Sequence, residues 1–313
     1  MSVLGIDTSN YTTSVAVFDG ADGYNAGQPL CVRPGELGLR QSDALFQHVR
    51  QLPALFSILA ERGDLDGITA VAASTRPRAV EGSYMPCFLP GEGQGRALAH
   101  ALHVPFYPVS HQQGHLAAAA WSAGRMELLD APHLAWHLSG GTTELLRVTP
   151  EGANVGAEIL GGTSDISAGQ LIDRTGQALG LAFPAGMALD DLAAGNTAVK
   201  GFPVTCKDFT FSLSGMENQV VALLARGEPP ANVAAFVMET VASVILRVTD
   251  AARKSYPGLP VLCSGGVSSS RVLRRRMEGA LFATPACAAD NAMGVAILAY
   301  RLQRAEERGA CHA

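Results

Sequence analysis

The chain has 313 residues, of which 48% are hydrophobic and 16% are charged, and its net charge is −5. So much apolar material excludes a disordered chain and supplies either one large core or two lobes. The acidic balance argues against a dedicated nucleic-acid binder, so an RNA partner would need a local basic patch or a helper subunit. The best patch, Arg271–Arg276, is more typical of a solvated helix face.

Hydropathy, the N-terminus and the cysteines bear on the compartment in which the chain acts. No run approaches the roughly 20 apolar residues that a membrane helix needs. Residues 1–7 lead directly into a predicted strand, without the basic region and cleavage site of a signal peptide, so we expect a cytoplasmic protein. The cysteines lack CxxC spacing, which favours reduced thiols over a cysteine zinc site. The six are Cys31, Cys87, Cys206, Cys263, Cys287 and Cys311.

Strand-like and helical runs alternate along the chain. In chain order the strand-like runs are Val3–Ile6, Ser14–Phe18, Ala70–Ala73, Leu134–Leu138, Leu145–Val148 and Val261–Cys263. The helical runs are Asp43–Arg62, Gly93–Leu102, Gly169–Leu179, Ala231–Lys254 and Asp290–Glu307. Mixed alternation of this kind favours an α/β fold over segregated sheets and helices. We expect joints between larger parts of the chain at Arg125–Pro132 and Leu281–Ala289.

Two segments about 130 residues apart share one pattern, which is the sign of an internal repeat. Val3–Val17 and Leu134–Val148 each read as strand, small polar turn and strand. Turns of Gly, Ser and Thr can offer backbone N–H groups and hydroxyls to phosphate oxygens. Each hairpin alone has common turn chemistry, but the pair favours two related lobes facing one cleft. A third small-residue turn, Ser264–Ser270, runs from a strand into a helix start and could cradle an anion.

His111 and His115 lie four residues apart where an alanine-rich helical run begins. Residues at i and i+4 share a helix face, so both imidazoles can bind one divalent ion. The pair lacks the intervening glutamate that a zinc protease uses as its general base. Asp290, at the predicted start of the last helix, is the candidate third ligand, and it could also serve as the helix N-cap. His133 and His137 have the same spacing but fall in a predicted strand, where they would be unrelated.

A series of motifs spans nearly the whole chain in order. They are LGIDTS at Leu4–Ser9, SHQQGH at Ser110–His115, SGGTTEL at Ser139–Leu145, AGQLIDRTGQALGLAFPAG at Ala168–Gly186, FTFSLSG at Phe209–Gly215, SGGVSSSRVLR at Ser264–Arg274 and ADNAMGVA at Ala289–Ala296. This series resembles the family of tRNA N6-threonylcarbamoyladenosine transferases, formerly called O-sialoglycoprotein endopeptidases. The resemblance implies an α/β actin-like ATPase fold, with two duplicated RNase H-like lobes around a nucleotide cleft. We expect residues 1–125 with 288–313 to form one lobe and residues 126–287 the other.

The resemblance also implies a set of ligands. By resemblance His111, His115 and Asp290 would hold iron or zinc. An adenine nucleotide (AMP, ATP or threonylcarbamoyl-AMP) would be bound by Ser139, Gly140, Asp173, Gly186 and Gly266. The family moves a threonylcarbamoyl group from threonylcarbamoyl-AMP to N6 of adenosine 37 in tRNA, and Asp173 would accept hydrogen bonds from the ribose hydroxyls. No catalytic residue is assigned.

Several positions differ from the family pattern and suggest a diverged paralogue. An acidic pair is replaced at residues 10–12, and a glycine-rich turn is replaced by Arg76–Glu81. Other departures are Thr142, Gln170, Ser270 and the sequence Pro184–Met187. Three functions therefore stay open: the tRNA transferase, a carbamoyl-type transferase with another acceptor, and a non-catalytic partner of a true transferase. We expect tRNA to be met through a helper subunit, and a homo- or heterodimer with a paralogous protein, away from any membrane.

Overall fold

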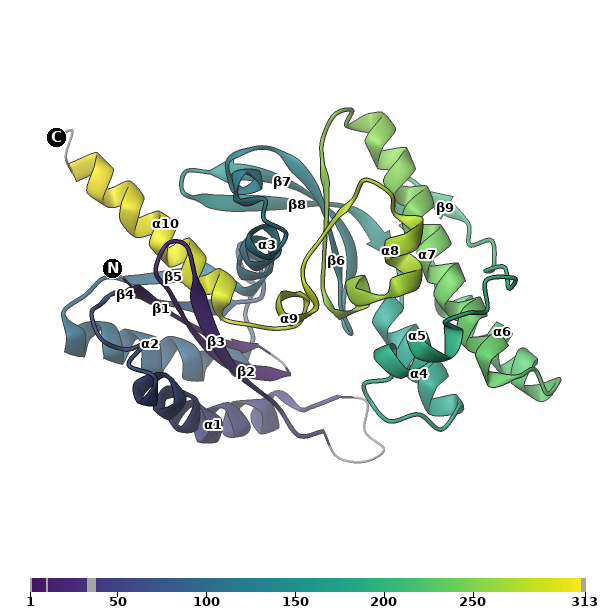
Figure 1. Ribbon diagram of the computed structural model, residues 1–313, viewed down its shortest axis with the longest axis horizontal. Helices are drawn as coiled ribbons and strands as arrows, with labels where there is room; N and C mark the ends of the chain where they lie inside the picture. The colour runs from purple at the N-terminus through teal and green to yellow at the C-terminus, as the bar shows by residue number, and fades with distance from the viewer. Residues whose placement is uncertain (1, 10, 33–37, 311–313) are drawn as a thin grey trace. The chain divides into compact units, whose positions relative to one another are not determined.

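The computed structural model describes residues 2–9, 11–32 and 38–310 (Figure 1). Contacts divide the chain into two compact units. Unit 1 comprises Met1–Ala131, Thr149–Ala157 and Asp290–Ala313, and unit 2 comprises Pro132–Val148 and Glu158–Ala289. The sequence analysis placed the boundaries of the first lobe after residue 125 and before residue 288. Asn10 and Cys311, which entered the sequence interpretation, lie outside the described residues.

Unit 1 is built on a five-stranded sheet. Its strands are β1 (Ser2–Ser9), β2 (Thr12–Phe18), β3 (Gly23–Pro29), β4 (Ile68–Arg76) and β5 (Phe106–Ser110). Their order is β3-β2-β1-β4-β5, in which β1, β2 and β3 are antiparallel neighbours and β4 and β5 run parallel to β1. The carboxyl ends of β1, β4 and β5 therefore meet at one edge of the sheet.

Helices cover both faces of this sheet. Helices α1 (Gln41–Glu61) and α2 (Leu89–Leu102) pack on the face that carries Leu4 and Ile6. Helices α3 (His111–Ser122) and α10 (Met293–Ala310) pack on the other face, where a Cβ on Gly5 would lie 2.6 Å from the Ala296 nitrogen. Figure 1 shows α10, at the yellow end of the colour scale, beside the purple strands of the N-terminus. The 3₁₀ turns η1 (Pro86–Phe88) and η2 (Met126–Asp130) complete the unit.

Unit 2 repeats the strand order of unit 1. Its sheet contains β6 (His133–Leu138), β7 (Thr143–Glu151), β8 (Asn154–Thr163), β9 (Cys206–Lys207), β10 (Thr210–Phe211), β11 (Val261–Ser264) and β12 (Leu281–Phe282). The order is β12-β11-β6-β7-β8-β10-β9, so β8-β7-β6-β11-β12 corresponds to β3-β2-β1-β4-β5. The directions agree as well, since β6 and β7 are antiparallel whereas β11 and β12 run parallel to β6. The repeat confirms the predicted duplication, which the two similar hairpins indicated.

The helices of unit 2 surround one long core helix. They are α4 (Ala168–Ala178), α5 (Gly186–Ala193), α6 (Ser214–Ala225), α7 (Pro230–Ser255), α8 (Arg271–Arg276) and α9 (Pro285–Ala288), with the 3₁₀ turn η3 (Gly266–Ser269). Among the described residues, α7 alone has the length and hydropathy of a membrane span, a feature the sequence analysis did not expect. Most of its apolar window is buried, as in the core helix of a globular unit.

The basic cluster on α8 is bound to its own unit. Arg271 pairs with Asp190, while Arg275 and Arg276 pair with Glu239. Arg274 donates hydrogen bonds to the backbone oxygens of residues 268 and 283. These arginine side chains are partly exposed, as expected for a solvated helix face. Their ion pairs and hydrogen bonds also hold α8 against the rest of unit 2. As predicted, none of the five described cysteines forms a disulfide.

Candidate metal centre and nucleotide-binding turns

The start of α3 is fixed by a capping box. Strand β5 ends at Ser110, whose Oγ accepts a hydrogen bond from the Gln113 nitrogen at 3.2 Å. The Gln113 side chain in turn accepts from the Ser110 nitrogen at 2.9 Å. This reciprocal pair satisfies two N–H groups that would otherwise lack partners and begins the helix at His111. His111 and His115 therefore lie on consecutive turns of one helix, as their spacing predicted.

Three predicted ligands converge in unit 1. His111 Nε2 lies 2.9 Å from His115 Nε2, and Asp290 Oδ1 lies 3.2 Å from His115 Nε2 and 3.6 Å from His111 Nε2. The side chains of His111 and Asp290 are 16% and 22% exposed, so the cluster is open to solvent on one side.

The predicted N-cap role of Asp290 was wrong. Helix α10 begins only at Met293, and Asn291 Oδ1 accepts a hydrogen bond from the Met293 nitrogen. The Asp290 carboxylate instead faces the two histidines, because the helix begins three residues later than the sequence suggested.

Asp7, at the end of β1, supports His111 from behind. Its Oδ2 lies 2.8 Å from His111 Nδ1, and its Oδ1 accepts a hydrogen bond from the Ser9 nitrogen at 2.8 Å. Burial opposes ionisation of Asp7, but the adjacent His111 outweighs it and lowers the pKa of this carboxyl. Burial likewise opposes protonation of His111, yet Asp7 and Asp290 raise its pKa to about 10. The cluster thus strongly favours a positive charge among its carboxylates.

These donors fit a divalent metal ion. Because His111 Nδ1 faces the Asp7 carboxylate, a ring proton is favoured at Nδ1, and a bound metal would take the place of the second proton at Nε2, which faces His115 Nε2 and Asp290. The two imidazole nitrogens and the carboxylate oxygen lie close enough to one another to bind a single cation. Two histidines and one carboxylate form a donor set used by both catalytic zinc and non-haem iron. The residues therefore fit either of the two predicted metals and do not choose between them.

Two predicted nucleotide-binding turns lie side by side in unit 2. The Ser139–Gly140 turn follows β6, and the Gly266 turn follows β11, which pairs in parallel with β6. Gly265 has φ +87°, and a Cβ there would lie 2.3 Å from the Leu138 oxygen. Only glycine allows the two turns to approach this closely. Gly140 and Gly266 are exposed, so the backbone of both turns is accessible to a ligand.

Helix α4 joins the first turn to Asp173 and Gly186. The Ser167 Oγ at its N-terminus donates to the Gly140 oxygen at 2.6 Å. Asp173, farther along α4, accepts a hydrogen bond at Oδ1 from the Ala185 nitrogen, directly before Gly186. Burial raises the pKa of Asp173. Helix α4 also contacts the η3 turn that contains Gly266, so all five predicted adenylate residues belong to one connected region of unit 2.

One residue of this region was missed by the sequence reasoning. Asp190 on α5 accepts hydrogen bonds from Ser270 Oγ at 2.7 Å and from the Arg271 nitrogen at 3.2 Å. Asp190 lies on α5, four residues after Gly186. Its hydrogen bonds to Ser270 and Arg271 tie α5 to the end of the Gly266 turn. The i+4 spacing from Gly186 was a visible signal, but its partners are about 80 residues away along the chain, beyond the reach of local patterns.

Two of the departures from the family pattern have clear local roles. Gln170 completes a capping box with Ser167 at the start of α4. Ser270 accepts a hydrogen bond from the Leu273 nitrogen and caps α8. A third departure, the loop that begins at Arg76, reaches α3, where the Pro77 oxygen accepts a hydrogen bond from the Gln112 nitrogen at 3.0 Å. This loop therefore lies beside the helix that carries the two candidate metal ligands His111 and His115.

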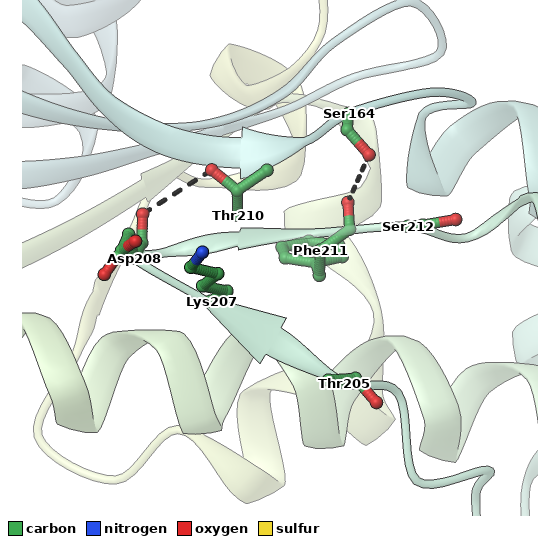
Figure 2. A pocket seen from close by; sticks show the side chains of 7 residues that line it. All are labelled: Ser164, Thr205, Lys207, Asp208, Thr210, Phe211 and Ser212. Atoms are coloured by element: carbon green, nitrogen blue, oxygen red, sulfur yellow. Dashed lines mark hydrogen bonds between the residues drawn. The ribbon is translucent and has the colours of Figure 1, made fainter.

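A separate open pocket lies at the β9–β10 hairpin. Figure 2 shows its lining residues Ser164, Thr205, Lys207, Asp208, Thr210, Phe211 and Ser212. The two-residue turn between the strands, Asp208 and Phe209, has left-handed backbone conformations with φ of 47° and 63°. None of the predicted site residues lines this pocket, so the nucleotide-binding prediction does not extend to it.

Comparison with solved structures identifies the fold. T. kodakarensis HypF superposes with a TM-score of 0.63 at 14% identity, over 98% of this chain and 48% of that chain. The (R)-2-hydroxyglutaryl-CoA dehydratase component A of Acidaminococcus fermentans gives a TM-score of 0.56 at 17% identity, over 98% of this chain and 99% of that chain. These similarities concern the fold alone, and they confirm the predicted actin-like ATPase fold.

Comparison of sequences identifies the family. The family model for tRNA N6-adenosine threonylcarbamoyltransferase (TsaD) matches residues 38–295. A protein of that name from Thermus thermophilus is 33% identical over 96% of this chain and 93% of its own length. The one from Thiobacillus denitrificans is 33% identical over 88% of this chain and 81% of its own length. This chain therefore belongs to the tRNA N6-adenosine threonylcarbamoyltransferase family, as its ordered motifs predicted.

Proposed function

We propose that this chain transfers a threonylcarbamoyl group from threonylcarbamoyl-AMP to N6 of adenosine 37 in tRNA. The observation that carries the proposal is the convergence of His111, His115 and Asp290 in a member of this family. In the reaction, N6 forms a bond to the carbamoyl carbon and loses a proton. The bond from that carbon to the phosphate oxygen breaks, and AMP leaves.

Each unit by itself carries residues suited to one part of this chemistry. His111, His115 and Asp290 would hold the iron or zinc ion, which supplies a Lewis acid for the carbamoyl carbonyl when bound. In unit 2, the accessible backbone of the turns at Gly140 and Gly266 suits the adenylate phosphate. Among the described residues, the Oδ2 of Asp173 accepts no protein hydrogen bond and suits the ribose hydroxyls.

A second candidate function is transfer of a carbamoyl-type group to a different acceptor. It is favoured by the loop at Arg76 and Arg78, which brings two arginines to the N-terminus of α3, where the family pattern has a glycine-rich turn. Added positive charge beside the proposed metal would change which acceptor fits there. A purely non-catalytic role has less support, because a scaffold has no need for the complete ligand set.

We further propose that the chain acts in the cytoplasm, where tRNA is modified, and that it needs a paralogous or other helper subunit to hold tRNA. The acidic net charge of −5 supports this, since phosphate contacts dominate the affinity of nucleic-acid binders. The arginines on α8, the best basic patch of the sequence, are paired with acids of unit 2 or bonded to its backbone.

The deciding experiment is a mass spectrum of tRNA nucleosides from a strain that lacks this chain. We expect threonylcarbamoyladenosine to disappear and to return with the wild-type gene, but not with the His111→Ala/His115→Ala double variant. Unchanged levels in a strain with no second family member would refute the tRNA function and favour another acceptor.

A further inference from the structure

We infer that Asp7 is a positioning residue that fixes the tautomer of His111, so that Nε2 of this histidine is always the atom offered to the metal. The inference rests on the proposed metal centre and concerns a residue that is not itself a ligand. Its basis is the 2.8 Å contact between Asp7 Oδ2 and His111 Nδ1.

The sheet places Asp7 for this role. Gly5 faces α10, and because side chains alternate along a strand, Asp7 and Ser9 face the same side. The Asp7 side chain is 1% exposed, so its direction is set by packing and not by solvent. Asp7 belongs to β1 and His111 to α3, two elements that meet at the carboxyl edge of the sheet in unit 1.

The ring geometry of histidine turns this contact into control of the ligand atom. The two ring nitrogens point in different directions, and a neutral ring carries its proton on only one of them. A carboxylate at Nδ1 keeps the proton there and leaves the lone pair at Nε2, which lies 2.9 Å from His115 Nε2. Without the carboxylate, the ring could carry its proton at Nε2, and that nitrogen could not bind a metal.

Asp7 must also be a carboxylate and not merely an isosteric amide. Its Oδ1 accepts from the Ser9 nitrogen while Oδ2 accepts from His111, so both atoms must be acceptors. Asparagine offers only one oxygen. If that oxygen serves Ser9, the NH₂ group faces His111 Nδ1 and selects the wrong tautomer. If the amide is reversed, the NH₂ group meets the buried N–H of Ser9.

The test measures zinc affinity by competition with a chelator in wild type, Asp7→Asn and Asp7→Glu. We expect Asp7→Asn to weaken zinc binding by about 10–100-fold, the effect seen when the partners of metal ligands are removed. Asp7→Glu, which keeps two acceptors, should bind zinc more tightly than Asp7→Asn. The matched control is Asp130→Asn, which removes the same charge from an exposed carboxylate of unit 1 paired with Arg301. It should leave zinc affinity unchanged.

A second measurement separates tautomer control from general damage to the fold. Long-range ¹H–¹⁵N spectra of zinc-loaded wild type should show His111 protonated at Nδ1, and this needs no variant to fold. A proton at Nε2 of His111, or equal zinc affinity in wild type and Asp7→Asn, would overturn the inference while leaving the metal centre intact. Failure of the wild type to bind zinc or iron would instead refute the proposed metal centre itself.

Discussion

Replacing Asp190 by alanine tests whether the nucleotide-binding turns depend on a buried carboxylate. The substitution removes the acceptor of Ser270 Oγ and of the Arg271 nitrogen. A hydrogen bond to a charged group contributes about 1.5–3 kcal/mol, and water replaces part of it here, so the two lost bonds should lower the free energy of unfolding by about 2–4 kcal/mol. The Arg271 guanidinium is exposed and is not counted in this figure.

The neighbouring Asp191 provides a matched control. It also pairs with Arg271, but its side chain is 64% exposed, so Asp191→Ala should change the free energy of unfolding by less than about 1 kcal/mol. In thermal unfolding we expect Tm to fall by roughly 5–15 °C for Asp190→Ala and by much less for Asp191→Ala. In calorimetry, AMP should bind Asp190→Ala about tenfold more weakly, which corresponds to about 1.4 kcal/mol. Identical Tm and AMP affinity in the two variants would show that Asp190 does not hold the Gly266 turn.

Four further measurements test other parts of the assignment. The His111→Ala/His115→Ala variant should lose the bound metal in elemental analysis, and retention of metal would contradict the ligand assignment. Asp173→Ala should weaken AMP binding by about 1–3 kcal/mol in calorimetry, and an unchanged affinity would remove Asp173 from the site. Burial lowers the pKa of His48 to about 4, so the unfolded chain binds the extra proton. The destabilisation caused by His48 should therefore be absent above pH 6.5 and reach about 2–3 kcal/mol as the pH drops to 4, so the stability of the wild type relative to His48→Gln should fall by that amount over this range. Finally, purified chain with threonylcarbamoyl-AMP and unmodified tRNA should give little product until a partner subunit is added, and rapid stoichiometric modification by the chain alone would refute the need for a helper.

The features that the sequence predicted best are local in the chain. The two hairpins and the shared helix face of His111 and His115 depend on residues within about 15 positions of one another, and their periodicity is readable directly. The contact between Asp7 and His111 joins residues 104 positions apart, and no spacing rule reports it. Asp190 was missed for the same reason, because its partners Ser270 and Arg271 lie about 80 positions farther along the chain. Asp290 shows a third case, since it lies beside the two histidines as the sequence suggested, while the helix start was placed three residues too early and its role as a ligand stays a prediction.

The departures from the family pattern divide into two kinds with different consequences. Gln170 and Ser270 still cap α4 and α8, so these changes preserve the local geometry of the proposed adenylate site. The Arg76 loop changes charge beside α3, and its Pro77 oxygen accepts a hydrogen bond from the Gln112 nitrogen in the first turn of that helix. The changes at Gln170 and Ser270 are compatible with binding the same donor substrate. The added charge of the Arg76 loop would instead alter the electrostatic attraction of any acceptor that approaches the proposed metal from solvent. If the acceptor differs from that of the relatives, the difference should therefore follow the Arg76 loop and not the turns of unit 2.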